Sequence, residues 1–327
     1  SKIFQLVNYF ALVLLVFLLY VSLQRYAYSR ELAAIVVFLA LCINVPVTRT
    51  LIYQQVNLYV LDLILLSLLF YPRFLFLSAL SLSAAIHIKI YPVLLALPFF
   101  YIRDWRWCAW FAISMAGIVL VTSLINSFDY YVDFVRVMMN WTLEGEASTF
   151  KETGIRNASV GTLVYNTLHL SGLDLWEYEK IIANLLRLLL IGIFMKASWS
   201  LMRKDGFHVR DGMSPVVLNG YVILPLFMLV VSPSVWPHHF VLLILTMPVL
   251  LSTLRDSSHF WLFCAAYVFI FLYPVNEIYP VSYLRLLGLV FIGVLLIKLA
   301  RDTQGSEPVW FADIKKRLGV IGAQSLR

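Results

Sequence analysis

Two adjacent histidines and one lysine are the residues in this sequence best suited to chemistry. His238 and His239 follow a stretch rich in serine and proline, and Lys89 lies in the apolar run IHIKIYP. Histidine transfers protons near neutral pH, and its neutral ring also hydrogen-bonds hydroxyl and phosphate groups. A lysine ammonium in apolar surroundings needs an anionic partner, and at a membrane interface a lipid phosphate is the most available one.

Each of these residues also has a plain structural interpretation. Lys89 could extend along a helix end to place its ammonium in water, although Pro92 breaks a helix and restricts the residue before it, which favours a shaped site. The histidines could be interfacial polar residues beside Trp236. A metal site is the weaker alternative, because no H-x-x-x-H spacing or carboxylate cluster accompanies them. We therefore expect no metal and a functional role for at least one histidine.

Amide side chains are further candidates for ligand binding. Gln54, Gln55 and Asn57 precede an apolar block, and Asn157 lies in the hydrophilic stretch 126–180. Such amides pack between membrane helices, where a hydrogen bond contributes about 1 kcal/mol, or they bind hydroxyl-rich ligands. The sequence leaves both interpretations open.

The composition is that of a membrane protein. The chain has 327 residues, 61% of them hydrophobic and 13% charged, whereas soluble domains have roughly 45–50% apolar and about 25% charged residues. The apolar residues form roughly eleven blocks, several of them shorter than a straight span of about 20 residues, and one is broken around residues 87–92. We expect an all-α polytopic bundle of about eleven transmembrane or half-membrane helices. A soluble enzyme and a nucleic-acid-binding domain are excluded, so no nucleic-acid partner is expected.

The basic residues predict how the chain is oriented. Short basic segments stay on the cytoplasmic side, and here they alternate with the polar segments that carry the candidate residues. This predicts one transmembrane domain over residues 1–300 with an extracytoplasmic loop at 126–180, followed by a cytoplasmic, basic, amphipathic tail at 301–327. Within the spans, we expect Asp62 to pair with a neighbouring helix and Arg285 to extend toward the interface.

Several short elements, taken in chain order, resemble the motifs of one family. They are QQVN (54–57) for its G-Q-x-N, KIYP (89–92) for its K-x-Y-P, RDWR (103–106) for its R-x-W-R, NAS (157–159) for its N-Q-S, and SPSVWPHH (232–239) for its S-P-x-S-W-x-H-H with altered spacing. The family is that of the GT-C-fold glycosyltransferases related to the mycobacterial α-mannosyltransferases that use polyprenol-phosphate mannose and extend phosphatidylinositol mannosides. The resemblance extends from about residue 3 to residue 300.

The resemblance implies the transfer of one hexose, with mannose as the leading candidate, from a polyprenyl-phosphate donor to a lipid-linked or membrane-proximal glycan acceptor. It implies an enzyme without a cofactor, in contact with membrane lipids and active on the extracytoplasmic side of a bacterial inner membrane. The residues that would bind substrate are Gln55, Asn57, Lys89, Tyr91, Asn157 and Trp236, and those that would act in catalysis are His238 and His239.

One family feature has no counterpart, and two other functions remain open. GT-C enzymes keep a catalytic aspartate in the first extracytoplasmic loop, which would precede Ile3 here, so we expect a sequence truncated at its N-terminus or an unmatched base. A transporter or flippase for lipid-linked sugars is favoured by inverted repeats, and no convincing one is found. A polysaccharide polymerase or ligase would use arginines in the outer loop, where Arg136 and Arg156 occur.

Overall fold

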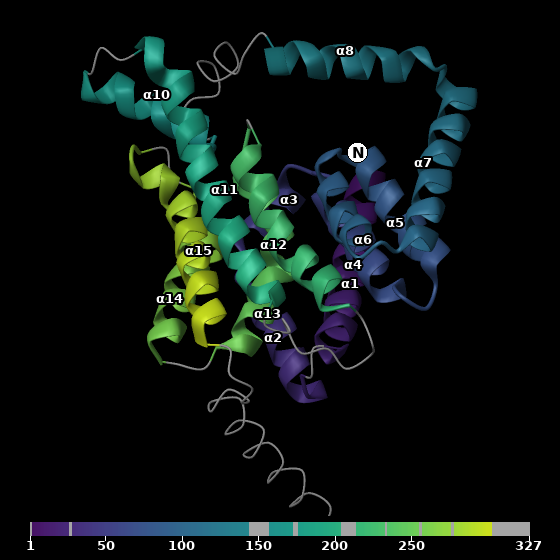
Figure 1. The fold of residues 1–327 in the computed structure, drawn as a ribbon, viewed down its shortest axis with the longest axis horizontal. Helices are drawn as coiled ribbons and strands as arrows, with labels where there is room; N and C mark the ends of the chain where they lie inside the picture. The colour runs from purple at the N-terminus through teal and green to yellow at the C-terminus, as the bar shows by residue number, and fades with distance from the viewer. Residues whose placement is uncertain are drawn as a thin grey trace, which may run out of the picture.

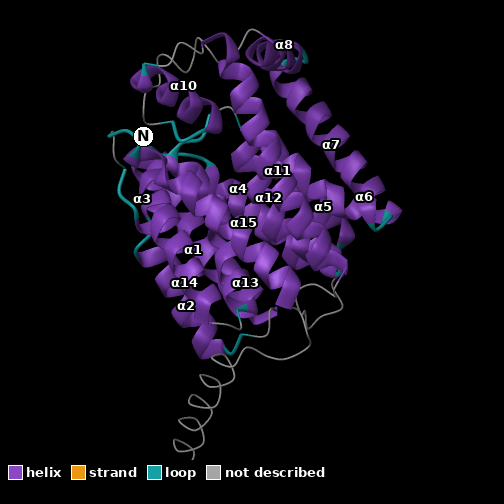
Figure 2. Cartoon of the chain, turned by 60° about the vertical axis from the view of Figure 1, so that its left-hand side comes forward, coloured by secondary structure: helices purple, strands orange, loops and turns teal. Residues whose placement is uncertain are grey.

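The computed structural model describes residues 2–25, 28–143, 157–172, 176–203, 214–232, 234–254, 257–275 and 278–302. Within these ranges all regular structure is helical (Figure 1), and short loops join the helices (Figure 2). The expected all-α class is therefore confirmed for the part of the chain that is described. The predicted cytoplasmic tail falls almost entirely outside it, and remains a prediction.

The first part of the chain, through the first helix of the outer loop, is a continuous series of helices. Their order is α1 (Lys2–Arg25), α2 (Arg30–Cys42), α3 (Val45–Ile52), α4 (Asn57–Phe70), α5 (Leu75–Ile88), the 3₁₀ helix η1 (Tyr91–Ala96), α6 (Leu97–Tyr101), α7 (Trp105–Asn126) and α8 (Asp129–Leu143). Figure 1 shows α8 lying crosswise to α7 at one end of the molecule, which we call the outer end because the sequence predicts it to be extracytoplasmic.

The second part of the chain supplies the remaining helices. They are α10 (Val160–Ser171), η3 (Trp176–Tyr178), α11 (Glu179–Arg203), α12 (Pro215–Val231), the 3₁₀ helix η4 (Pro237–Ile244), α13 (Thr246–Thr253), α14 (Ser257–Tyr267), the π-helix η5 (Val268–Leu272), η6 (Val281–Tyr283) and α15 (Leu284–Asp302). Helix α10 lies at the outer end with α8 (Figure 1). The predicted loop 126–180 is thus partly helical where it is described.

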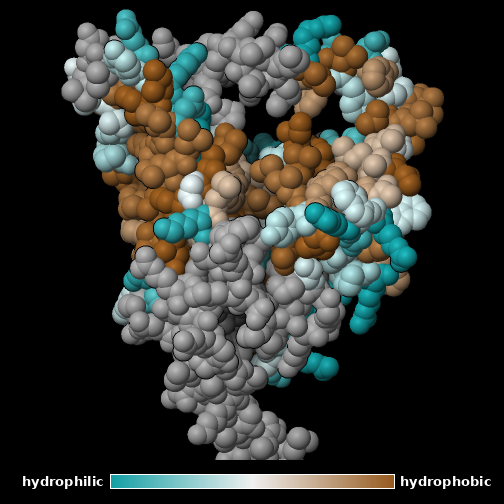
Figure 3. All heavy atoms as spheres, in the orientation of Figure 1, coloured by the Kyte–Doolittle hydropathy of each residue, from teal (hydrophilic) through white to brown (hydrophobic). Residues whose placement is uncertain are grey.

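Fewer helices can cross a membrane than the apolar blocks suggested. Among the described residues, α1, α7 and the stretch Val281–Leu299 are long and apolar enough, and α2 with α3 makes a fourth span if this pair, bent by 57°, is counted as one. Five other apolar helices have only 10–17 residues. The count of about eleven is therefore not confirmed, although the helices fit a membrane protein. Figure 3 shows hydrophobic residues over α11 and α15 on this face, with hydrophilic and hydrophobic ones mixed at α8 and α10 and further hydrophilic ones toward the opposite end.

The bend between α2 and α3 is made by one asparagine. The side chain of Asn44 donates to the carbonyl of Ala40 at the end of α2 (2.8 Å) and accepts from the amide of Val47 at the start of α3 (3.0 Å). Closing one helix and capping the next in this way turns the chain without leaving buried polar groups unpaired. The bend sets the direction of α3, which packs against η4.

Helices α4 and α5 form an antiparallel hairpin that brings the ends of the two helices together. Its inner part is fixed by buried polar contacts: the Ser78 hydroxyl donates to the carbonyl of Ser67 (2.8 Å), and the indole of Trp107 donates to the same hydroxyl (2.9 Å). As the sequence predicts, the helical run is broken at residues 87–92, where α5 ends at Ile88 and η1 begins at Tyr91. The first residue of α4 and the residue after α5 consequently face each other.

Candidate functional site

Asn57 and Lys89 meet at the open end of the α4–α5 hairpin. Asn57 is the first residue of α4 and is 0% exposed. Lys89 is the half-buried residue that caps the end of α5, and its ammonium donates to Oδ1 of Asn57 across 2.6 Å. An ammonium has three N–H groups, so this bond leaves two of them to be satisfied by other groups.

Asn57 also ties the hairpin to the histidine segment. Its Nδ2 donates to the backbone carbonyl of His238 across 3.1 Å, in a buried contact between residues 181 positions apart. Both ends of the amide are therefore used, and the orientation of the side chain is fixed by its two partners. The outcome is that η4 is held next to Lys89.

The ring of His239 faces the Lys89 ammonium. Its Nδ1 accepts a hydrogen bond from the backbone amide of Trp236 (3.2 Å), so the neutral ring carries its proton on Nε2. Nε2 lies 3.5 Å from Nζ of Lys89. A charged ammonium and an Nε2–H group are both donors, and neither satisfies the other. A group with several acceptor oxygens, such as a phosphate, can accept from both.

His238 is buried beside this pair, with 7% of its surface exposed. Its ring lies edge-on to that of His239 at 4.6 Å and parallel to that of Trp236 at 6.5 Å. In the described part of the chain, Nδ1 of His238 has no hydrogen-bond partner. A buried ring nitrogen without a partner is available to a ligand that enters the site.

Burial sets the charges of the site at neutral pH. Lys89, His238 and His239 all lie outside the candidate spans. Burial lowers the pKa of Lys89 to about 8, so this residue is still mostly charged at pH 7. Burial and the neighbouring Lys89 charge lower the pKa of His238 to about 4, and they hold the pKa of His239 well below its usual range. The site therefore combines one cation with two neutral imidazoles.

Asn157 lies behind the histidine segment and braces it. Its Oδ1 accepts from the backbone amides of Val235 (2.8 Å) and Ser159 (3.1 Å), and the amide of Ala158 donates to the carbonyl of Val235 (2.7 Å). Asn157 is 0% exposed, and its Nδ2 is buried without a partner among the described residues. These contacts link the outer loop to the residues just before His238.

The other predicted substrate-binding residues are divided between the site and its edge. The Tyr91 ring lies 5.7 Å from the Lys89 ammonium, which is a cation–π distance. The Trp236 ring lies parallel to that of His238, and its backbone amide donates to His239. Gln55 instead donates weakly to the carbonyl of Tyr53, at 3.5 Å. The structure thus brings Asn57, Lys89, Tyr91, Trp236 and the two histidines together, with Asn157 behind them and Gln55 outside.

One residue near the site was missed from the sequence, and an arginine at the start of α15 was misread. The ring of Tyr53 lies 6.3 Å from that of His238. Nothing in the sequence around Tyr53 separates it from the other aromatic residues of a membrane protein. Arg285 was expected to extend toward the interface, and this is wrong: the side chain is 2% exposed and donates to the backbone carbonyl of Tyr273.

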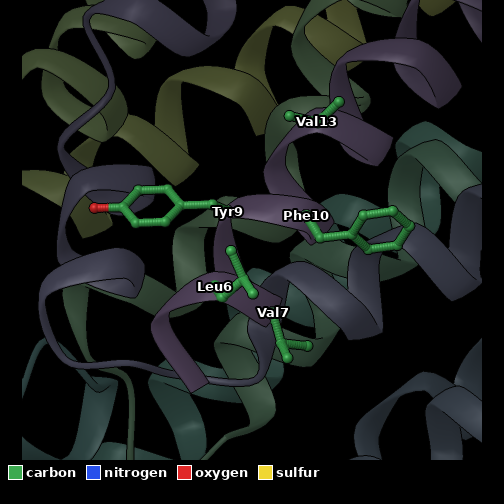
Figure 4. Close-up of a pocket in the computed structure, with 5 residues that line it drawn as sticks. All are labelled: Leu6, Val7, Tyr9, Phe10 and Val13. Carbon is green, nitrogen blue, oxygen red and sulfur yellow. The ribbon is translucent and has the colours of Figure 1, made fainter. Parts of the chain in front are cut away.

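An apolar groove lies on α1, apart from these polar residues. It has a volume of about 570 Å³ and is lined by Leu6, Val7, Tyr9, Phe10 and Val13 (Figure 4). The side chains shown there carry one hydroxyl group, that of Tyr9, and no charge. The groove has the character of a surface that contacts lipid.

The chain belongs to glycosyltransferase family 87, whose family model matches residues 3–233. With its apolar helices, this makes the protein a membrane glycosyltransferase. The match includes Asn57, Lys89 and Asn157 and ends five positions before His238. Comparison with curated proteins and with solved structures gives no match. The expectation of a glycosyltransferase is confirmed, whereas the resemblance to the mycobacterial mannosyltransferases stays a prediction.

Proposed function

We propose that the enzyme transfers a hexose, with mannose as the leading candidate, from a polyprenyl-phosphate donor to a lipid-linked or membrane-proximal glycan. The reaction takes place on the extracytoplasmic face of a bacterial inner membrane. The observation that carries the proposal is the Lys89 ammonium 3.5 Å from Nε2 of His239, the nitrogen that carries the ring proton when Nδ1 accepts from the Trp236 amide. This pair suits the phosphate of a lipid-linked donor.

The proposed chemistry uses this phosphate as the leaving group. A hydroxyl oxygen of the acceptor forms the new bond to the anomeric carbon, and the bond from that carbon to the phosphate oxygen breaks with both of its electrons. The proton of the hydroxyl passes to an oxygen of the departing phosphate, which leaves as polyprenyl phosphate. Negative charge on the departing polyprenyl phosphate grows as the bond breaks. Lys89 and His239 stabilise this charge more strongly in the transition state than in the bound donor, which accelerates the reaction.

The neighbouring residues have distinct proposed roles. His238 is neutral and has a free Nδ1, so it accepts a hydrogen bond from the acceptor hydroxyl and orients it toward the donor. The aromatic faces of Tyr91 and Trp236 flank the sugar. Asn57 keeps Lys89 and the histidine segment in register, and Asn157 acts from behind as a positioning residue.

The alternatives have less support. Membership of a glycosyltransferase family favours transfer over transport. A polymerase or ligase would draw on arginines of the outer loop, but Arg136 is exposed on α8 and pairs with Asp133 at 3.0 Å. Arg156 lies outside the described residues.

The test is an assay of the purified protein in phosphatidylcholine vesicles with two labelled donors, polyprenyl-phosphate mannose and a nucleotide-linked mannose. We expect label to move to a glycolipid acceptor from the lipid donor alone. Lys89→Met should remove most of this activity, and Lys89→Arg should retain more of it, because a charge-assisted bond to phosphate is lost only in the first. Lys180→Met, at an exposed position on α11, is the control. Transfer from the nucleotide sugar alone, or normal activity of Lys89→Met, would disprove the proposal.

A further inference from the structure

A buried arginine lies at the outer end of α15, away from Lys89. Arg285 is the second residue of α15 and is 2% exposed. One of its terminal nitrogens donates to the carbonyl of Tyr273, and Nε is buried without a partner among the described residues. A buried guanidinium whose donors are only partly used is costly unless a further acceptor is present.

The acceptor of Arg285 is presented by a local irregularity of the helix. Residues Val268–Leu272 form a π-helix, and the amide of Tyr273 donates to the carbonyl of Val268, five positions earlier (2.8 Å). Such segments occur often at functional sites. Gly288 allows α15 to come close to this segment, since a Cβ at this position would lie 2.7 Å from the Ile270 side chain. The contact between Arg285 and Tyr273 is thus built into the packing of two helices.

A second arginine lies on α3, a helix that contacts the same π-helix. Arg49, on α3, donates to the hydroxyl of Tyr53 (2.9 Å), and its guanidinium is 5.7 Å from the centre of the same ring. Helix α3 packs against η5. Helix α15 packs against η5 as well, so the helices that carry Arg49 and Arg285 meet the same π-helical segment. Within the described residues, no carboxylate forms an ion pair with either arginine.

We propose that Arg49 and Arg285 form a second anion site, which binds the phosphodiester group of a lipid. Two guanidinium groups with unused donors match such a group in charge and in hydrogen bonding. Tyr53 connects Arg49 to the catalytic region, because its ring lies 6.3 Å from His238. The two cationic subsites therefore flank the histidines, with Lys89 near His239 and Arg49 near His238.

The phosphodiester can come from the acceptor or from a lipid of the surrounding bilayer. The first source rests on the proposed function, because it makes the acceptor an anionic glycolipid whose phosphate anchors it beside His238. The second makes the site a structural lipid site. The proposal that the two arginines bind a phosphodiester is the same for either source.

The experiment measures binding of short-chain phosphatidylglycerol to the purified protein in neutral detergent, with short-chain phosphatidylcholine as the comparison. We expect Arg49→Gln and Arg285→Gln each to weaken phosphatidylglycerol binding by about tenfold or more. Arg106→Gln, at an exposed position on α7, should leave it unchanged. Lys89→Met should weaken it less than either arginine variant does, because that residue belongs to the donor subsite. If Arg285→Gln does not fold, the binding experiment uses two other variants. They are Arg285→Lys, which keeps the charge, and Arg49→Gln, which lies on a different helix.

Two further measurements are needed. One distinguishes the acceptor from a bilayer lipid as the source of the phosphodiester, and the other tests whether Arg285 is instead part of an internal ion pair. If the acceptor supplies the phosphodiester, Arg49→Gln raises the KM for acceptor in any bilayer; if the bilayer supplies it, wild-type activity depends on phosphatidylglycerol content while that KM is unchanged. Glu277, which lies outside the described residues, is tested as Glu277→Gln. A loss of thermal stability in this variant as large as in Arg285→Gln, with no lipid binding by the wild type, would show an internal ion pair and overturn the proposal. Lipid binding without sugar transfer would leave the site intact and reject the proposed function.

Discussion

The Lys89 ammonium lies 2.6 Å from Oδ1 of Asn57, the amide whose nitrogen holds the carbonyl of His238. One neutral side chain therefore connects the cation of the site to the backbone of the histidine segment. Because the amide is neutral, it orients the ammonium without cancelling its charge. A carboxylate at this position would hold Lys89 more tightly and would compete with a bound phosphate.

The first prediction follows from this. Asn57→Asp keeps the size of the side chain but pairs Lys89 with a carboxylate and replaces the donor to the His238 carbonyl with an acceptor. We expect kcat/KM for the lipid donor to fall by about 10²-fold. The new carboxylate takes Lys89 from the donor phosphate, and the buried hydrogen bond to the His238 carbonyl is lost. Asn184→Asp, at an exposed position on α11, is the matched control. A variant with wild-type donor affinity would show that Asn57 is only a packing residue.

The second prediction concerns pH. Burial lowers the pKa of Lys89 from 10.5 to about 8, so the charged form is present below pH 8 and is lost above it. We expect kcat/KM for the lipid donor to fall by about tenfold per pH unit above this point. Stability should change in the opposite direction: the free energy of unfolding should rise between pH 8 and 10.5, because folding disfavours the charged form.

Lys89→Arg provides the control for this profile. Arginine stays charged throughout the range, so the decline in kcat/KM above pH 8 should disappear in this variant even if its activity is lower. A decline that persists with arginine would assign the titration to another residue.

The third prediction tests whether the side chains of the two histidines take part in the reaction. His238→Ala and His239→Ala should each lower kcat by about 10²-fold or more, because a hydrogen-bonding or charge-stabilising group is lost from the site. Replacement by Gln should restore part of the activity, since an amide can still donate or accept in place of a neutral imidazole. Ser234→Ala should have little effect. The folding of each variant is checked by size-exclusion chromatography, and full activity in both Ala variants would remove the histidines from the mechanism.

The fourth prediction tests the close packing of α6 against α12. A Cβ on Gly220 of α12 would lie 2.2 Å from Cγ of Pro98 in α6, and a proline ring cannot move aside easily. We expect Gly220→Ala to lower the unfolding temperature, with a cost of about 1–3 kcal/mol from overpacking. Gly117→Ala on α7 is the control, because no atom lies within 4 Å of its Cβ position. Equal stability of the two variants would contradict the close contact between α6 and α12.

Parts of the site could be predicted because its residues stand out against their local sequence. Lys89 is a charge in an apolar run, and Pro92 restricts the residue before it, so a break at this point follows from local backbone preferences. The contribution of Asn157 could not be predicted in the same way. Its role depends on the amide of Val235, 78 positions away, and neither residue type indicates such a contact.

Composition and hydropathy could not predict the number of membrane spans or the burial of Arg285. Hydropathy identifies apolar blocks, but α4 and α5 are short helices buried against neighbours, so an apolar block and a full span are different things. Arg285 occurs near the end of an apolar block, where an arginine usually extends to the interface. The irregular turn that supplies its acceptor has no sequence signature.

That irregular turn also has a consequence for chain length. A π-helix accommodates one residue more than an α-helix over the same turn, so Val268–Leu272 amounts to a single inserted residue that the packing has absorbed. Removing one residue here would restore a regular α-helix, and the residues on either side would keep their register. The i→i−5 bond from the Tyr273 amide to the Val268 carbonyl would be lost, and with it the local backbone that presents the Tyr273 carbonyl to Arg285. A homologue with a gap of one position at this point is therefore expected to lack this carbonyl contact with Arg285.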